Sequence, residues 1–193
     1  SLGQSSKEVE KTIQKRYFSI VKKLKLSIDI KNEFEEIAKK ISGGASPDYA
    51  ASRGEYLSGK IVAEALGYEF VDAATCISFD ARGYVKSDEK LRKLVGDRHV
   101  VIPGFYGAMP DGSIKTFSRG GSDVTGAIVA RAVKAEKYEN WTDICGLRMA
   151  DPRVVKDPKK ITVVTYKELR ELSYMGASVF HEEAVFPTQE AGI

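Results

Sequence analysis

A glycine turn in the middle of the chain carries the side chains best suited to chemistry. Residues 115–127 read KTFSRGGSDVTGA, after an apolar run at 100–105 that predicts a buried strand and before apolar residues at helical spacing. Two adjacent glycines let the backbone turn tightly and leave N–H groups free at a helix start, where negative charge is favoured. Arg119 beside such a turn suits a carboxylate or a phosphate. An ordinary helix start capped by Ser122 or Asp123 fits the same residues equally well.

A second candidate is Glu55, on a helix that the sequence predicts over residues 47–66. A serine–proline pair begins this helix and a glycine follows its last apolar residue. Glu55 shares a row of the helix with small and apolar residues, where a carboxylate needs a partner. Gly54 and Gly59 weaken the helix and are expected to allow a close approach by another segment. The alternative is a surface glutamate on a helix loosened by glycine.

The composition indicates a globular protein without a charged binding surface. Of the 193 residues 30% are charged, and the net charge is only +3 with basic and acidic residues interleaved, which argues against a nucleic-acid partner. No apolar run approaches the ~20 residues of a membrane span, so no membrane partner is expected. Cys76 and Cys145 lie far apart and predict two structural thiols in a reduced, cytoplasmic protein. With only two histidines, a His/Cys metal site is disfavoured, and no metal ligand is assigned.

Strands alternating with helices predict an α/β fold with a mainly parallel sheet. Residues 1–45 are expected to form a helical segment and 46–193 the remainder of the same domain. The expected helices cover 7–26, 29–41, 47–66, 87–94, 166–174 and 179–187, with a central helix after the glycine turn. The expected strands cover 68–73, 75–79, 100–105 and 161–164, with a turn or small hairpin between 106 and 117. Ligands bind off the carboxyl ends of such strands, which points to the loops at 104–107, 118–123 and 142–153. Neither a GxxxxGK[ST] nor a GxGxxG motif is present, which disfavours P-loop and Rossmann enzymes.

Five motifs in register resemble the aspartate kinases, over about residues 46–190. They are FSRGGSDVTGA, NWTDICG, MADPRVV, YKELRELSYMGASVFHEEAVFP and the glutamate-bearing helix SRGEYLSGKIVAEALGYEFVDA. The family belongs to the amino acid kinase superfamily, so the resemblance implies a three-layer αβα sandwich, here incomplete. It also implies transfer of a phosphoryl group from MgATP to the side-chain carboxylate of L-aspartate. The product, 4-phospho-L-aspartate, leads to lysine, threonine and methionine.

The resemblance assigns five residues to the substrate. Glu55 matches the glutamate that contacts the substrate ammonium, and Arg119 matches the arginine that pairs with its carboxylate. Ser122 matches a neighbouring substrate residue, while Asp123 matches the residue that organises the reacting groups. Phe105 stands where the family shapes the substrate pocket. Arg119 and Asp123 are therefore the implied catalytic residues.

The nucleotide side is implied in the same way. Thr142, Asp143 and Arg153 match nucleotide-binding residues of the family. Arg148 stands where the family often has a tyrosine, and Ser178 where many members have a lysine. ATP and Mg²⁺ are the implied cofactors, and a homodimer is expected because it is usual in the family. The substrate carboxylate has a reference pKa of about 4, so the reaction needs no general base.

Two parts of the family pattern are missing. The KFGGS-type strand whose lysine holds the transferred phosphate does not occur, and the chain stops before the C-terminal ACT domains. We therefore expect the chain as written to be a poor kinase. Two alternatives stay open: another superfamily member acting on glutamate, acetylglutamate or uridylate, and a catalytically incompetent fragment that binds substrate only.

Overall fold

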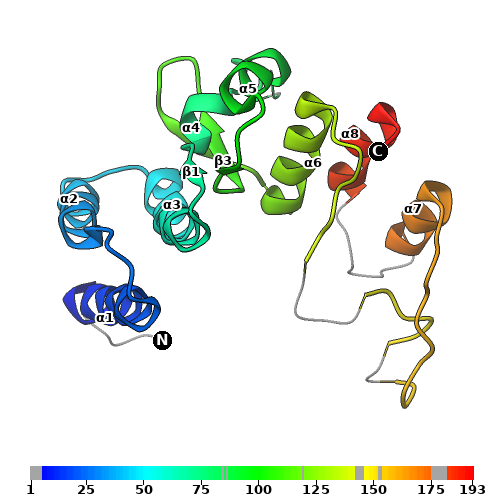
Figure 1. Cartoon of the computed structure of the whole chain (residues 1–193), viewed down its shortest axis with the longest axis horizontal. Helices are drawn as coiled ribbons and strands as arrows, with labels where there is room; N and C mark the ends of the chain where they lie inside the picture. The colour runs from blue at the N-terminus through cyan, green and yellow to red at the C-terminus, as the bar shows by residue number, and fades with distance from the viewer. Residues whose placement is uncertain are drawn as a thin grey trace. The chain divides into compact units, whose positions relative to one another are not determined.

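The structure is a computed structural model, which describes residues 6–83, 85, 87–118, 120–141, 146–151, 154–174 and 182–193. The chain divides into two compact units, Ser1–Thr116 and Phe117–Ile193 (Figure 1). The boundary that the sequence suggested at residue 45 lies inside the first unit. Helices and short strands occur together, in keeping with the predicted α/β class.

Two amphipathic helices begin the first unit. Helix α1 spans Ser6–Leu24 and helix α2 spans Ile30–Ser42, close to the predicted ranges. Asp29 caps α2, because its carboxylate accepts a hydrogen bond from the backbone N–H of Lys31 at 3.2 Å. A side chain that accepts from the first turn satisfies a donor that the helix itself cannot pair.

Helix α3, which carries Glu55, spans Pro47–Leu66 as predicted. The Ser46 side chain accepts a hydrogen bond from the backbone N–H of Tyr49 at 3.1 Å and so caps the first turn. Gly67 ends the helix in the left-handed region, with φ at 69°. Both ends of α3 are therefore set by local chemistry that the sequence shows.

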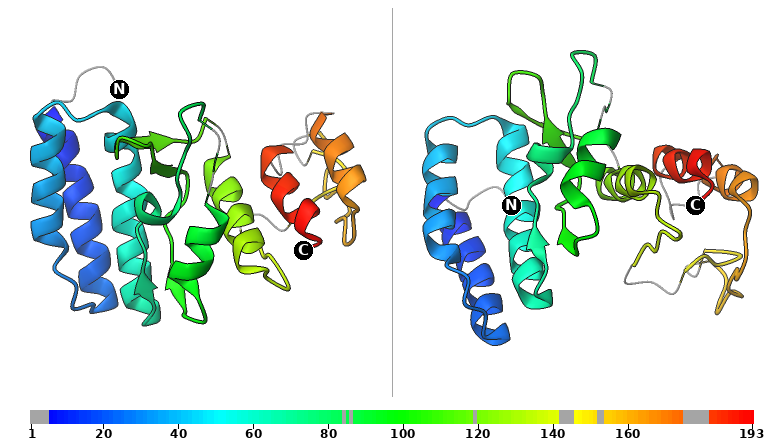
Figure 2. Two further views of the ribbon diagram at one scale, coloured as in Figure 1. Left: turned by 90° about the horizontal axis from the view of Figure 1, so that it is seen from above. Right: turned by 45° about the horizontal axis from the view of Figure 1, so that its top comes forward.

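The apolar core of the first unit lies between α2 and α3. Three side chains of α2 meet two of α3, and all five are buried: Ile30, Phe34, Ile37, Leu57 and Ile61. Helices α1, α2 and α3 run side by side (Figure 2, blue to cyan). Burial of each such side chain contributes about 1.5–3 kcal/mol relative to exposure.

Short strands complete the first unit. Strand β1 (Glu69–Phe70) pairs in parallel with β2 (Val100–Val101), and β3 (Tyr106–Ala108) pairs antiparallel with β4 (Ile114–Thr116). The predicted strands at 68–73 and 100–105 are present in shorter form. The predicted hairpin is confirmed.

One predicted strand of the first unit is only partly present. The sequence predicts a strand over 75–79, but α4 occupies Ala73–Cys76, and only Ser78 and Phe79 form isolated β-bridges. Asp72 is its N-cap and accepts a hydrogen bond from the backbone N–H of Ala74 at 3.0 Å. This cap favours a helical turn over an extended backbone. Helix α5 follows at Asp88–Val95, close to its predicted range.

The two glycines of α3 differ in what lies against them. A Cβ at Gly59 would lie 3.1 Å from a ring carbon of Phe70 and 3.3 Å from Pro103, so the expected close approach holds there. A Cβ at Gly54 would lie at an ordinary 3.6 Å from the Tyr17 hydroxyl. Gly59 thus brings α3 onto the strands, whereas Gly54 does not.

Among the residues that the structure describes, the second unit contains three helices. Helix α6 (Gly121–Val133) packs against α8 (Glu182–Ala191), and α7 (Tyr166–Tyr174) also contacts α8. Arg131 on α6 lies 3.6 Å from Glu190 on α8, which adds an ion pair to this packing.

The strand predicted at 161–164 is wrong. These residues are irregular, and the strand pairing described near them is an isolated bridge between Arg148 and Lys160. An apolar run of four residues forms a strand only where a neighbour offers a ladder of hydrogen bonds. Within the described ranges no helix is both long and apolar enough to cross a membrane.

Gly107 of β3 provides a test of the packing in the first unit. A Cβ there would lie 2.6 Å from the backbone oxygen of Ile77, so Gly107→Ala should lower the free energy of unfolding by about 1–3 kcal/mol. Gly54→Ala is the matched control and should stabilise by up to about 1 kcal/mol through helix propensity. Urea unfolding measures both, and a Gly107→Ala protein as stable as the parent would contradict the contact.

Cys76 provides a second test. Its side chain is fully buried, and burial, followed by the nearby charge of Asp72, raises the pKa of its thiol to about 11. At pH 8 the thiolate is then about one part in a thousand, so iodoacetamide should leave Cys76 unmodified in the folded protein and modify it in urea. Peptide mass spectrometry reads this residue directly, and rapid native modification would disprove the buried placement. Cys145 lies outside the described residues.

Candidate functional site

Glu55 lies on an open face of α3. Its side chain is exposed, and no residue in the described ranges makes a hydrogen bond or an ion pair with it. Val62 and Leu66, further along the same row, are 45% and 56% exposed. The row therefore faces outward, and the carboxylate does not need the internal partner that its neighbours suggested. An unpaired carboxylate on a rigid helix can bind a ligand ammonium group.

Phe105 stands immediately before strand β3 in an unusual backbone conformation. Its φ is 64°, in the left-handed region that side chains rarely adopt. Its ring is half-buried and meets the ring of Tyr106 edge to face, with centroids 6.3 Å apart. The backbone therefore fixes the direction of a large apolar side chain, which suits a pocket wall.

The glycine turn begins α6 without a side-chain cap. Gly120 is the N-cap, with φ at 54° and ψ at 23°, and no side chain accepts from the first turn. The alternative in which Ser122 or Asp123 caps the helix is therefore wrong, because both lie inside it. Ser122 is exposed and Asp123 half-buried, so both side chains remain available beside backbone N–H groups that attract anions. Arg119 lies outside the described residues.

The segment after α6 folds back onto its first turn. The Asn140 side-chain amide donates a hydrogen bond to Asp123 Oδ1 at 3.0 Å, and the Tyr138 hydroxyl donates to the Asp123 backbone oxygen at 3.4 Å. A Cβ at Gly126 would lie 2.5 Å from the Tyr138 hydroxyl, so the tyrosine lies directly over this glycine. Burial, and then the charge of Asp123, raises the pKa of Tyr138. Its phenol therefore stays protonated and can keep donating.

Tyr138 and Asn140 are residues that the sequence analysis missed. Their one local signal is a glycine in the middle of a good helix, which often marks the close approach of another group. The contact brings the start of the NWTDICG motif to Asp123 within the same unit. Trp141, the next residue, is 88% exposed, because the segment touches α6 through Tyr138 and Asn140.

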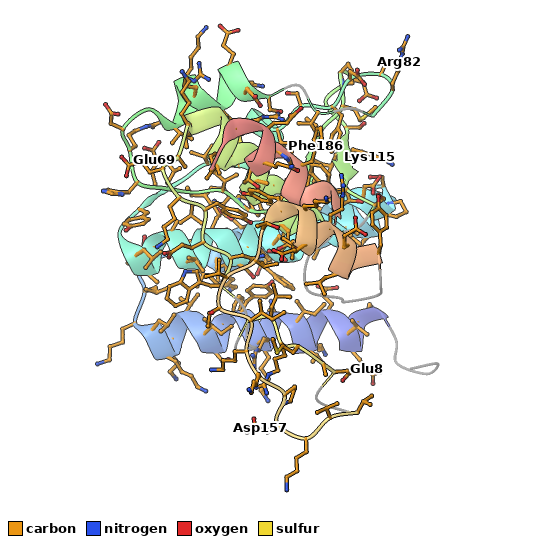
Figure 3. All side chains as sticks on the ribbon, turned by 90° about the vertical axis from the view of Figure 1, so that its right-hand side faces the viewer. Glu8, Glu69, Arg82, Lys115, Asp157 and Phe186 are labelled. Atoms are coloured by element: carbon orange, nitrogen blue, oxygen red, sulfur yellow. The ribbon has the colours of Figure 1, made fainter. Side chains whose placement is uncertain are left out.

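Most of the predicted nucleotide residues lie outside the described residues: Thr142, Asp143, Arg153 and Ser178. Arg148 is described and half-buried, and one of its guanidinium nitrogens lies 3.8 Å from Asp157, which Figure 3 labels. Asp157 is almost fully exposed, so this ion pair is weak and does not prevent Arg148 from turning to a phosphate. Among the described residues no group of three or more His, Cys, Asp or Glu could hold a metal ion.

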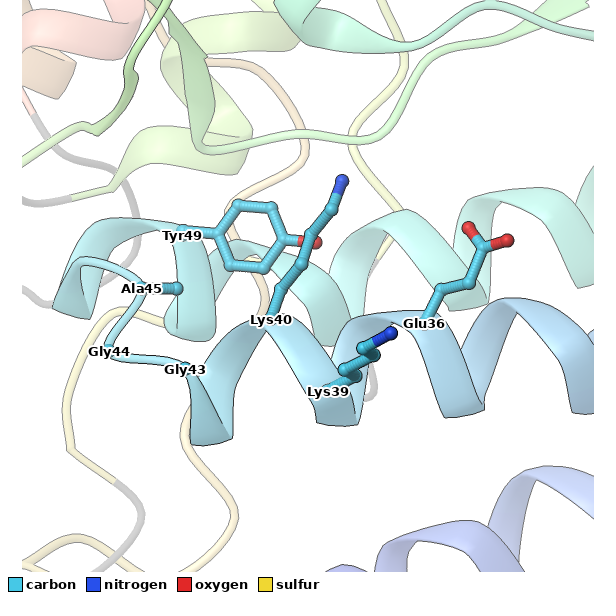
Figure 4. A pocket seen from close by; sticks show the side chains of 7 residues that line it. All are labelled: Glu36, Lys39, Lys40, Gly43, Gly44, Ala45 and Tyr49. Carbon is cyan, nitrogen blue, oxygen red and sulfur yellow. The ribbon is translucent and has the colours of Figure 1, made fainter.

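An open hollow of about 670 Å³ lies where α2 ends and α3 begins (Figure 4). Lys39, Lys40 and Tyr49 line it together with Glu36 and the connecting glycines. The Lys40 ammonium lies 5.9 Å from the centre of the Tyr49 ring. None of the predicted site residues that the structure describes lines this hollow, so we do not assign it to the candidate site.

Known proteins similar to this chain agree on one family. The model of the amino acid kinase family matches residues 4–193. Aspartokinase 3 of Bacillus subtilis (strain 168) is 33% identical, over 98% of this chain and 46% of that protein. The chain thus spans about half the length of the curated relatives it matches.

Solved structures give the same picture. The aspartate kinase of Clostridium acetobutylicum is 53% identical with a TM-score of 0.90, over 97% of this chain and 44% of that chain. Aspartokinase III of E. coli, solved in complex with aspartate and ADP, is 26% identical with a TM-score of 0.82, over 98% of this chain and 48% of that one. The likeness confirms the predicted class as an incomplete amino acid kinase fold. The chain belongs to the amino acid kinase family.

Proposed function

We propose that the protein containing this chain is an aspartate kinase. It transfers a phosphoryl group from MgATP to the side-chain carboxylate of L-aspartate, giving 4-phospho-L-aspartate. The observation that carries the proposal is the start of α6, where Asp123 is held by Asn140 beside first-turn backbone N–H groups that no described side chain caps. Relatives named as aspartokinases, and a related structure bound to aspartate and ADP, support it.

In this proposal the amino acid is bound at both of its charged ends. Glu55 binds the ammonium, since its carboxylate is exposed and without a described partner. Arg119 binds the carboxylate, which suits a planar guanidinium. Ser122 adds a hydroxyl from the exposed side of the helix start, and Phe105 forms the apolar wall.

The nucleotide is proposed to lie against Thr142, Asp143, Arg148, Arg153 and Ser178. Mg²⁺ enters as part of MgATP, since this ion is usually held by phosphates together with one or two carboxylates. Asp123 is the carboxylate beside the glycine turn that can face it. Phosphoryl transfer then depends on positioning and on neutralising phosphate charge, which free N–H groups and arginines supply.

The wider setting follows from the same proposal. The product would feed the synthesis of lysine, threonine and methionine, and the enzyme would act as a cytoplasmic homodimer. The free, buried thiol of Cys76 is compatible with a reducing compartment. A kinase for another amino acid or for uridylate is less favoured, because the matched relatives are named for aspartate.

Replacing Glu55 tests the substrate side. Glu55→Gln removes the charge that pairs with the ammonium, so KM for L-aspartate should rise about 10- to 100-fold while KM for ATP stays unchanged. Glu64→Gln, also exposed on α3, is the matched control and should behave like the parent. Aspartyl hydroxamate formation by the intact protein measures both constants. If Glu55→Gln and Glu64→Gln have the same KM for L-aspartate, Glu55 does not bind the substrate.

Replacing Asp123 tests the reacting centre. Asp123→Asn keeps the side-chain oxygen that accepts from Asn140 but loses the charge, so kcat should fall about a hundredfold or more. Glu136→Gln, an exposed change in the same unit, should leave kcat unchanged. The hydroxamate assay with saturating substrates decides, and full turnover by Asp123→Asn would overturn the assignment.

A further inference from the structure

Arg53 is a buried cation that the proposed reaction does not use. The residue is only 7% exposed, and its guanidinium carbon lies 4.6, 4.6 and 5.2 Å from the ring centres of Tyr49, Tyr56 and Tyr106. Across the described ranges no carboxylate lies within ion-pair distance of it. The faces of three aromatic rings are therefore its main electrostatic compensation.

One hydroxyl group fixes the orientation of this guanidinium. Ser52 is fully buried, and its hydroxyl donates to the backbone oxygen of Tyr49 at 2.8 Å. Because its single hydrogen is used there, its lone pairs accept from two nitrogens of Arg53, at 3.1 and 2.9 Å. The guanidinium plane is thus held by hydrogen bonds on one edge and by rings on its faces.

The three rings come from two different elements. Tyr49 and Tyr56 belong to α3, but Tyr106 belongs to β3 and is fully buried. The Tyr106 hydroxyl donates to Asp72 Oδ1 at 2.7 Å, and burial together with the Asp72 charge keeps its pKa far above the ordinary value. The phenol therefore remains a donor, and Tyr106 cannot shift without breaking this bond.

Arg53 joins the two elements next to the proposed substrate residues. Glu55 lies two positions after Arg53 on α3, and Phe105 directly precedes Tyr106. The same hairpin is attached to α3 at a second point, where Asp48 accepts a hydrogen bond from Thr116 and lies 3.7 Å from the Lys115 ammonium. Two attachments prevent the hairpin from pivoting about either one.

We propose that Arg53 is a positioning residue. Its guanidinium, enclosed by Tyr49, Tyr56 and Tyr106, keeps Glu55 and Phe105 in the relative positions that the amino acid substrate requires. It does not touch the substrate. The inference rests on the proposed function, because it assumes that Glu55 and Phe105 bind that substrate.

The test compares Arg53→Met and Arg53→Lys in the intact protein, by calorimetric titration with L-aspartate and with MgATP. Arg53→Met keeps the length of the side chain but loses its charge and donors, and it should weaken L-aspartate binding about tenfold with MgATP binding within about twofold of the parent. Arg53→Lys restores the charge and should recover part of the loss. A lysine variant no better than the methionine variant would overturn the role of the cation.

A matched control separates positioning from general destabilisation. Lys60→Met removes another cation of α3, which lies over the rings of Tyr56 and Phe70 and pairs with Glu33. It should lower Tm but leave L-aspartate affinity within about twofold of the parent.

The outcomes separate the inference from the proposed function. If Lys60→Met and Arg53→Met lose L-aspartate affinity equally, the positioning role of Arg53 is overturned, while the proposed function stands. If the parent protein binds no L-aspartate, the proposed function fails as well. If Arg53→Met does not fold, Arg53→Gln takes its place, and an L-aspartate affinity of Arg53→Gln equal to the parent's overturns the inference.

Discussion

The apolar contact between α2 and α3 holds the helix on which the first unit is assembled. With Leu57 and Ile61 packed against α2, the remaining faces of α3 are left for other partners. Gly59 admits the ring of Phe70, and Arg53 reaches across to β3. The face that carries Glu55 is left open as a consequence, since each other side of the helix is in use. A free carboxylate on a firmly held helix is thus a result of how the unit packs.

The two units stabilise their proposed site residues by different physical means. In the first unit, aromatic rings surround a buried charge, where salt has little effect because water is excluded. In the second unit, an amide and a phenol hold Asp123 from a segment that folds back over Gly126. Those hydrogen bonds are partly open to water and therefore contribute little net free energy each. What these hydrogen bonds do is fix the direction of the Asp123 carboxylate.

Local chemistry explains which features the sequence predicted correctly. The ends of α3 were predictable because Ser46 and Gly67 act on the residues beside them, and the glycine turn was predictable for the same reason. The α4 turn was missed, although the capping residue Asp72 was visible. The rings around Arg53 were not predictable, because Tyr106 is distant in sequence and a periodic pattern counts an arginine as a surface residue. The predicted roles of Arg119 and of residues 142–143 fall outside what the structure describes.

The backbone of Phe105 has a consequence for how this protein can change. A non-glycine residue in the left-handed region costs on the order of 1–3 kcal/mol, and glycine would relieve that cost. Selection for thermal stability alone would therefore favour glycine at this position, while selection for an apolar pocket wall keeps phenylalanine. The two pressures act on the same residue in opposite directions. Mutant libraries screened only by melting temperature would be expected to lose the ring first.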